Sequence, residues 1–289
     1  MANTITLKRR IGSVKNTRQI TKAMELVAAS KMRRAQEYAA TGRMYRQYAY
    51  SLLTRLSAIT EVEEHPLFVK RPIKRRVYIV ITSNRGLAGA YNANIIRLLA
   101  RQIMADKQAG IKSQVIAIGK QGANFARRVE DIDLIAAFTE MDDHPTANDV
   151  RPVLETAIKM YANKEVDDVQ LLYTQFKTNL LQETTQLGLL PARFEATTGE
   201  EPLYTATFEP SIEVVLDNVT ERLLEVQLWQ AILESIASEH SMRMMAMKNA
   251  TDNASDLIDD LTLAFNTARQ AAITQELAEI TGGAEAIAA

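Results

Sequence analysis

The chain has 289 residues, of which 47% are hydrophobic, 24% charged and 6% aromatic, and this size and composition can bury a core in one or two structural units. It contains no cysteine, which excludes disulfide frameworks, thiolate metal sites and cysteine nucleophiles. The net charge of −1 hides an asymmetry, because residues 1–60 hold 12 basic and 2 acidic side chains, a net of +10, whereas residues 209–289 hold 4 basic and 14 acidic, a net of −10.

The N-terminal segment predicts one long helix, since residues 5–59 contain no proline. Its first residues carry charge but no apolar signal region, and no stretch of the chain approaches the roughly 20 apolar residues that span a bilayer. We therefore expect a soluble or peripheral protein with no direct transmembrane segment. Apolar residues at helical spacing form the expected packing face of this helix: Ile20, Met24, Val27, Ala28, Met32, Ala35, Tyr38, Tyr45, Tyr48, Leu52 and Leu56.

The middle of the chain, residues 61–208, alternates short β-rich runs with helical stretches. Strands are predicted at residues 77–82, 115–119, 132–138, 169–176 and 186–190, and helices at residues 92–108 and 148–163, with a short helix after the second strand. This alternation is typical of an α/β sheet with helices on its faces.

The C-terminal segment, residues 209–289, predicts a second long helix because neither glycine nor proline occurs from Ser211 to Thr281. Positions at alternating spacings of four and three are mostly apolar, which matches the seam of a left-handed coiled coil. We infer that this acidic helix pairs antiparallel with the basic helix of residues 1–60. The seam positions are Ile212, Leu216, Val219, Leu223, Val226, Gln230, Leu233, Ala237, His240, Met244, Met247, Thr251, Ala254, Ile258, Leu261, Phe265, Ala268, Ala272 and Gln275.

No pattern in the sequence indicates a cofactor or a catalytic group. The glycine-containing loops at residues 85–89 and 119–122 follow predicted strands, but neither matches a dinucleotide or P-loop motif, so we interpret both as turns. The three histidines, at positions 65, 144 and 240, lack metal-ligand spacing, and His240 is expected to set the register of the seam. No serine-nucleophile motif occurs.

Two charged features of the sequence are interpreted as parts of the protein surface. The adjacent carboxylates Asp142-Asp143, Asp167-Asp168 and Asp259-Asp260 point in different directions on regular elements and are expected to be solvated. The basic N-terminal helix could bind phosphates of a nucleic acid, but the chain has no recognisable nucleic-acid module. An acidic protein partner is the better interpretation, because the helix is also apolar on one side.

Three parts of the chain carry recognisable motifs. These are residues 10–11, 16–17, 19–25, 27–28 and 31–33 near the N-terminus, residues 82–87 in the middle, and residues 244–254, 268–276 and 279–280 near the C-terminus. The motifs resemble those of the gamma-subunit family of the rotary F-type ATP synthase, of the bacterial type. In residues 82–87, Asn84 replaces the aspartate of the family's Thr-Ser-Asp-Arg-Gly-Leu motif, which argues against a carboxylate role at this position.

The resemblance implies a fold and a role. Family members have an antiparallel coiled coil made from both termini and a central Rossmann-like α/β domain that holds no nucleotide. The coiled coil stands in a ring of three alpha and three beta subunits, one gamma per ring, and the α/β domain contacts epsilon and the ring of c subunits. The implied function is a torque-transmitting shaft without an active site, metal or cofactor, on the cytoplasmic face of the bacterial cell membrane.

The resemblance also implies contact residues for the beta subunit. Lys22 and Met24 fall in the stretch near the moving C-terminal region of beta, although a methionine at this spacing is as readily explained by packing. The other contacts with beta that the resemblance implies are Arg243, Arg269, Gln270 and Thr274.

Two other classes of function stay open, a coiled-coil tether or scaffold and a Rossmann-type enzyme.

Overall fold

A computed structural model describes residues 4–57, 65–130, 132–143, 145–192 and 211–288. The chain forms two compact units, one of residues 1–28 and 243–289 and the other of residues 29–242. Helices α1 (Thr4–Ser57) and α5 (Ile212–Ala288) each contribute residues to both units. None of the helices in the described part of the chain is both long and apolar enough to cross a membrane.

The larger unit contains one five-stranded sheet with the order β3-β2-β1-β4-β5. The first four strands are parallel, and β5 pairs antiparallel with β4. In the centre of the sheet, Ile79 of β1 pairs with Ile116 of β2 and with Leu171 of β4. The strands are β1 (Arg75–Ile81), β2 (Lys112–Ile118), β3 (Asp133–Phe138), β4 (Asp168–Phe176) and β5 (Gln182–Leu190).

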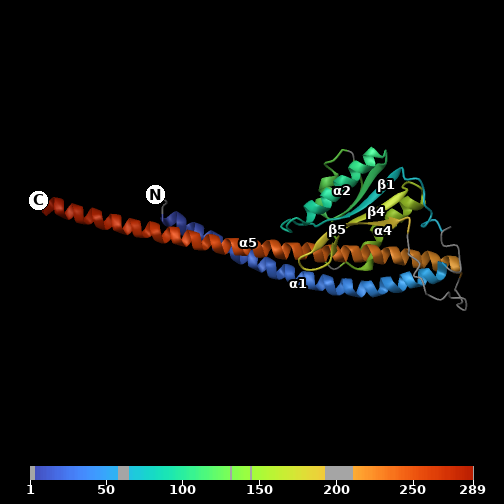
Figure 1. Ribbon diagram of the computed structural model, residues 1–289, viewed down its shortest axis with the longest axis horizontal. Helices are drawn as coiled ribbons and strands as arrows, with labels where there is room; N and C mark the ends of the chain where they lie inside the picture. The colour runs from blue at the N-terminus through green and yellow to red at the C-terminus, as the bar shows by residue number, and fades with distance from the viewer. Residues whose placement is uncertain (1–3, 58–64, 131, 144, 193–210, 289) are drawn as a thin grey trace. The chain divides into compact units, whose positions relative to one another are not determined.

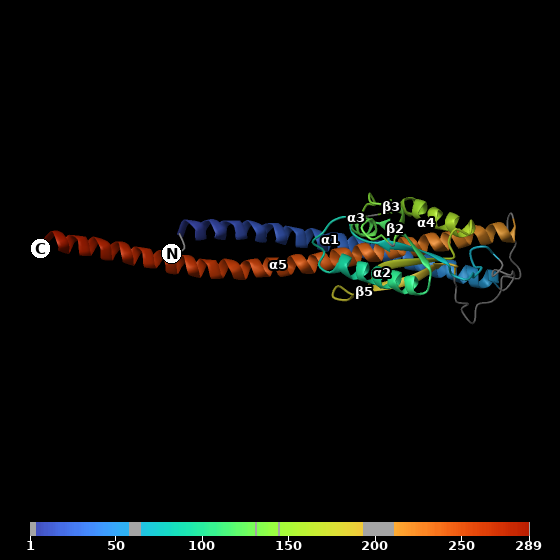
Figure 2. The same cartoon turned by 90° about the horizontal axis from the view of Figure 1, so that it is seen from above.

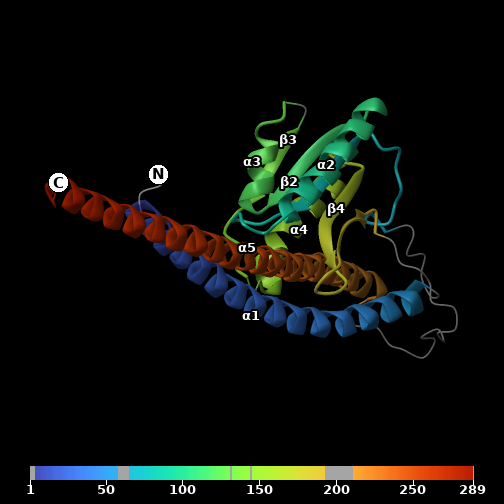
Figure 3. The same ribbon diagram turned by 60° about the vertical axis from the view of Figure 1, so that its left-hand side comes forward.

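Helices cover both faces of this sheet (Figure 1, Figure 3). On one face, α2 (Tyr91–Gln108) and α3 (Lys120–Ala126) pack on a core that includes Tyr78 and Val80. On the other face, α4 (Ala147–Ala162) and α5 pack on a core that includes Val77 and Ile79. Adjacent strand residues thus point to opposite faces, and both faces are buried, which explains the continuous apolar runs in the sequence.

Serine side chains of α5 complete the hydrogen bonding of β4. The ladder between β1 and β4 ends at Leu172, so the next strand residues have no partner on that side. At Thr174 the backbone N–H donates to Ser235 Oγ at 3.0 Å, and Ser238 Oγ donates to the Thr174 carbonyl at 3.1 Å. All three residues are buried, so these bonds replace a missing strand.

The predicted fold is confirmed. Each predicted strand and helix of the middle segment is present, with β5 beginning four residues earlier than expected, at Gln182. The two long helices are also present, over Thr4–Ser57 and Ile212–Ala288.

One prediction about surface carboxylates is wrong. Asp168 is 2% exposed, and Arg76 Nε donates to its carboxylate at 2.5 Å. The same guanidinium donates to Asp106, which also accepts hydrogen bonds from the Tyr78 hydroxyl at 2.7 Å and the Ser113 hydroxyl at 3.0 Å. Burial and the hydrogen bond to Asp106 raise the pKa of Tyr78 well above its ordinary value. This buried network joins the amino ends of β1 and β4 to the end of α2.

The Ser235→Ala substitution tests the role of α5 as a substitute strand. We expect it to lower the free energy of unfolding by about 1–3 kcal/mol, because it leaves the buried N–H of Thr174 without an acceptor. Chemical denaturation of the full chain measures this change. The control is Ser255→Ala, which removes only a bond to the Thr251 carbonyl within α5 and should change stability by less than about 0.5 kcal/mol. Equal effects of the two substitutions would contradict the assignment.

Candidate partner interface

The smaller unit is a pair of antiparallel helices, the first part of α1 beside the last part of α5 (Figure 2). Its seam buries Leu7 of α1 and Met247, Ala254 and Ile258 of α5. A hydrogen bond of 2.8 Å between the hydroxyls of Thr21 and Thr251 crosses the seam. The contact between these two residues fixes the register of the pair.

The seam predicted for α5 is confirmed from Leu216 to Ala272, where its positions are all buried or half-buried, but it is wrong at Gln275, which is exposed. The side chain of Ile212 lies outside the described residues. The seam position His240 is buried, but its imidazole faces Asp143 of the loop between β3 and α4, with Nε2 3.6 Å from Oδ1. Asp143 is consequently not the freely solvated carboxylate that the sequence predicted.

The packing face predicted for α1 is partly wrong. Ala28, Met32 and Ala35 are buried as expected, but Ile20, Val27 and Tyr38 are at least half exposed. The seam of α1 instead continues back from Ala28 at spacings of four and three, through polar positions such as Thr21, so hydrophobicity alone gave the wrong face. The side chains of four further predicted members lie outside the described residues: Tyr45, Tyr48, Leu52 and Leu56.

The exposed side of α1 is basic and partly apolar. Ile20, Leu26 and Val27 are 55–61% exposed and lie close in sequence to exposed cationic side chains. No ion pair in the described part of this unit joins a basic side chain of α1 to an acidic side chain of α5, so the opposite charges of the two helices are not neutralised by direct pairing. The basic side chains of α1 in this unit, all exposed, are Lys8, Arg9, Arg10, Lys15, Arg18 and Lys22.

The six residues predicted to contact a partner separate into two groups. Lys22 is exposed and pairs with Glu25 at 3.1 Å, whereas Met24 and Arg243 are half-buried. These three lie where both helices are present. Met24 is therefore partly a packing residue.

The second group lies further along α5. Arg269, Gln270 and Thr274 are exposed, and the Thr274 hydroxyl donates to the Gln270 carbonyl at 3.0 Å. Arg269 is 26 residues, or about 39 Å, beyond Arg243 along the helix. The Thr21–Thr251 register places this group at the N-terminal end of α1, and α5 continues beyond it (Figure 2).

The last part of α5 is exposed on all sides. Every residue from Ile273 to Ala284 is exposed, including the apolar side chains of Leu277 at 58% and Ile280 at 68%. A helix with exposed apolar residues around it is typical of a segment that is covered by a partner.

At the carboxyl edge of the sheet, the N-terminus of α3 is occupied by the chain itself. The first three N–H groups of α3 donate to the β1 loop: Lys120 to Asn84 Oδ1 at 3.0 Å, Gln121 to the Ser83 carbonyl at 3.2 Å and Gly122 to Thr82 Oγ1 at 2.9 Å. These donors are the ones that a phosphate would use. An amide oxygen at Asn84 accepts this bond as a carboxylate would, which accounts for the asparagine.

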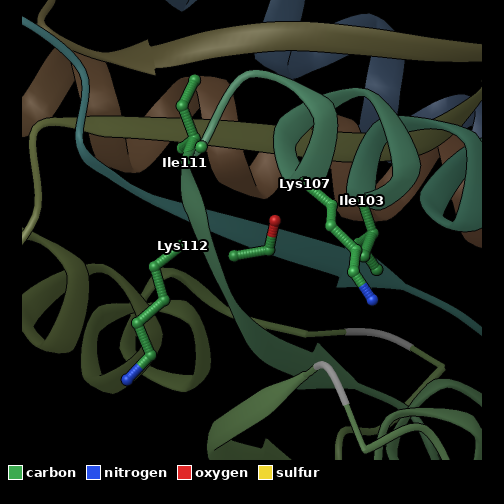
Figure 4. A pocket seen from close by; sticks show the side chains of 6 residues that line it. Ile103, Lys107, Ile111 and Lys112 are labelled. Carbon is green, nitrogen blue, oxygen red and sulfur yellow. The ribbon is translucent and has the colours of Figure 1, made fainter.

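A shallow pocket lies at the opposite edge of the sheet, beside the end of α2 (Figure 4). The side chains of Lys107 and Lys112 extend away from each other there, and the Lys112 ammonium is 3.9 Å from the Asp133 carboxylate. Binding sites require polar groups that converge on one point, so this pocket has little to hold a ligand. The lining residues are Ile103, Lys107, Gly110, Ile111, Lys112 and Ser113.

Two histidines have structural partners. His65 Nε2 is 2.6 Å from Asp217 Oδ1, and His240 faces Asp143, whereas His144 lies outside the described residues. Among the residues that the structure describes, no three His, Asp or Glu side chains are grouped to hold a metal ion.

Comparison with known sequences gives matches over almost the whole chain. A family described as ATP synthase matches residues 3–287. The ATP synthase gamma chain of Herpetosiphon aurantiacus is 46% identical and covers 99% of both chains. The ATP synthase gamma chain of Acidithiobacillus ferrooxidans is 40% identical, covering 99% of this chain and all of that one.

Solved structures show the same fold. A chain in the central stalk and c-ring of Tetrahymena thermophila mitochondrial ATP synthase has a TM-score of 0.63 and 25% identity, covering 80% of this chain and 99% of that one. A chain of Euglena gracilis mitochondrial ATP synthase has a TM-score of 0.70 at 20% identity, covering 98% and 94%. The similarity to the Euglena gracilis chain concerns the fold alone.

The Gly119→Ala substitution tests the closed carboxyl edge. Gly119 has a φ of +94°, and a Cβ there would lie 2.1 Å from the Thr82 carbonyl oxygen. We expect a loss of about 3 kcal/mol or more in the free energy of unfolding, measured by denaturation. Gly86→Ala is the control, because a Cβ at Gly86 meets open space, and its effect should stay within about 0.5 kcal/mol. A stable Gly119→Ala chain would show that the edge is open.

Proposed function

The chain belongs to the ATP synthase gamma chain family, and on this basis we propose that it is the central rotor shaft of an F-type ATP synthase. In this role it transmits torque between a proton-driven c ring and the catalytic sites on beta. It thereby couples proton transport to ATP synthesis and hydrolysis. Residues 1–60 and 209–289 supply the shaft, and residues 61–208 supply the α/β domain.

The two-helix unit is the observation that carries this proposal. Among the described residues of this unit, the basic side chains of α1 form no ion pair with a carboxylate of α5, and residues 273–284 of α5 are all exposed, apolar residues included. Both features suit a helix pair enclosed by other subunits, with acidic segments outside α1 and an apolar sleeve around the end of α5. Because the two sides of the pair differ in charge, the three beta subunits around it would each meet a different surface.

The proposed partners are three alpha and three beta subunits around one copy of this chain, with epsilon and the c ring at the α/β domain. The similarity to a chain in the central stalk and c ring of Tetrahymena thermophila mitochondrial ATP synthase supports the c ring as a partner. The protein is then a peripheral part of a membrane complex, on the cytoplasmic face of the bacterial membrane.

We propose that the chain itself is not catalytic. The amides at the carboxyl edge of the sheet are already bonded, and this supports an α/β domain that holds no nucleotide. Catalysis then takes place on beta, and this chain changes the conformation of the catalytic sites by its rotation.

The contact residues form two proposed levels along the shaft. The first level has Lys22 and Met24, facing the mobile C-terminal region of beta, and Arg243, facing loops of beta. Arg269, Gln270 and Thr274 make the second, facing loops of beta near the end of α1. The two levels differ in exposure. All three side chains of the second level are exposed, whereas Met24 and Arg243 are half-buried and also pack within this chain.

The alternative is a non-catalytic tether or scaffold, which uses the same helices but needs no ring-shaped partner. Co-expression of the chain with alpha and beta subunits, native mass spectrometry and an ATPase assay on the same sample separate the two. The shaft predicts one copy bound to three alpha and three beta subunits, with ATPase activity that the chain alone lacks. A free chain, or an equal number of copies of all three subunits, would favour the tether.

Replacement of Lys8, Arg9 and Lys15 by glutamine tests the electrostatic part of the proposal. We expect slower association with the alpha and beta subunits and a weaker dependence of the rate on salt, because these exposed cations would attract acidic segments. Stopped-flow association at several salt concentrations measures both. A control with the same change of charge replaces exposed Arg101, Arg127 and Arg128 of the α/β domain and should behave as wild type. Identical salt dependence in the wild type, the variant and the control would contradict an electrostatic role of these three side chains.

A further inference from the structure

Asp143 connects both long helices to the sheet. It lies in the loop between β3 and α4, its carboxylate pairs with the Lys31 ammonium of α1, and it is 3.6 Å from His240 Nε2 of α5. The three residues are distant in sequence, since Lys31 and Asp143 are 112 residues apart. One carboxylate is therefore shared by three elements of the larger unit.

The loop is held to α5 at a second point. The Trp229 indole N–H donates to the Pro145 carbonyl at 2.8 Å, eleven residues before His240 on the same helix. The N–H of Asp143 also donates to Asp142 Oδ1 at 2.6 Å, which fixes the loop backbone next to the shared carboxylate. The loop thus has defined contacts on both sides of Asp143.

The contacts of Asp143 lie close to the points where α1 enters and α5 leaves the larger unit. Lys31 comes two residues after α1 enters the larger unit at residue 29, and His240 comes two residues before α5 leaves it at residue 242. Both contacts hold the helices, within the larger unit, to the loop after β3. The ion pair between Lys31 and Asp143 is directional, and it adds to the close packing of the helices a polar contact that defines the position of α1 relative to this loop. His240 Nε2 lies 3.6 Å from Asp143 Oδ1, which brings α5 to the same loop.

We propose that Lys31, Asp143 and His240 form a clamp, based on the Lys31–Asp143 ion pair, that transmits torque between the α/β sheet and helices α1 and α5 within the larger unit, with Asp143 as the positioning residue. This proposal rests on the shaft function. The neighbouring His240 imidazole and the Lys31 ammonium hold the pKa of the Asp143 carboxyl well below its ordinary range, so this carboxylate stays ionised at neutral pH.

The test compares Asp143→Asn and Asp143→Glu in the membrane complex assembled around this chain. ATP hydrolysis and ATP-driven proton pumping are measured on the same vesicles. The clamp predicts that Asp143→Asn loses most of its pumping per ATP hydrolysed, and that Asp143→Glu, which keeps the carboxylate, recovers it. A role in folding alone would lower the amount of complex and both activities together.

The control is Glu155→Gln, which removes an exposed carboxylate of α4 that is 3.6 Å from Lys159. It should pump as wild type. An unchanged ratio of pumping to hydrolysis in Asp143→Asn would overturn the clamp and leave the shaft function intact. A wild-type complex that does not pump would instead contradict the shaft function.

If the Asp143→Asn chain does not assemble into the complex, a double-mutant cycle on the full chain tests the contact between Lys31 and Asp143. Lys31→Ala, Asp143→Ala and the double variant are unfolded in denaturant at neutral pH. The clamp predicts that the two substitutions are coupled by a factor of about 2 or more in the unfolding equilibrium constant. Independent effects would overturn it.

Discussion

The structure depends on one continuous helix, α5, whose seam repeats every 3.5 residues over most of its length. In the larger unit this seam is buried between the sheet and the other helices, and from Leu223 to Ser241 the opposite side of the helix is buried or half-buried as well. In the smaller unit the same seam packs on α1, and most of the other described residues of α5 are exposed. A single repeat thus specifies the core of an α/β layer and the interface of a helix pair, and a break in α5 would affect both.

The α/β unit keeps the topology of a nucleotide-binding sheet but uses its carboxyl edge differently. Thr82, Ser83 and Asn84 occupy the amides of α3, and Gly119 allows the two loops to approach each other closely. This closure supports the proposed role of the α/β unit as a body for contacts with other proteins, in agreement with the principle that function depends on the site and not on the fold. The serines of α5 bond the helix directly to the backbone of β4.

Much of the fold could be predicted from the sequence. The strands are short apolar runs between turns, and the α5 seam is mostly apolar, so both give clear periodic signals. The face of α1 was misassigned because its seam contains polar residues such as Thr21, while apolar Ile20 and Val27 are exposed. The roles of Asp143 and Asp168 could not be predicted, because their partners Lys31 and Arg76 are 112 and 92 residues away and only the folded chain brings them together. The two levels of contact residues came from resemblance, and they stay predictions.

The most direct test of the central claim is a single-molecule rotation assay. The alpha and beta subunits are fixed to a surface, a bead is attached to the α/β domain of this chain, and ATP is added. The account predicts unidirectional rotation with three equivalent resting positions in each turn, set by the three beta subunits, and loss of that rotation when Met247→Pro interrupts α5 at a buried seam position. A bead that stays fixed or moves at random while the complex hydrolyses ATP would contradict the account.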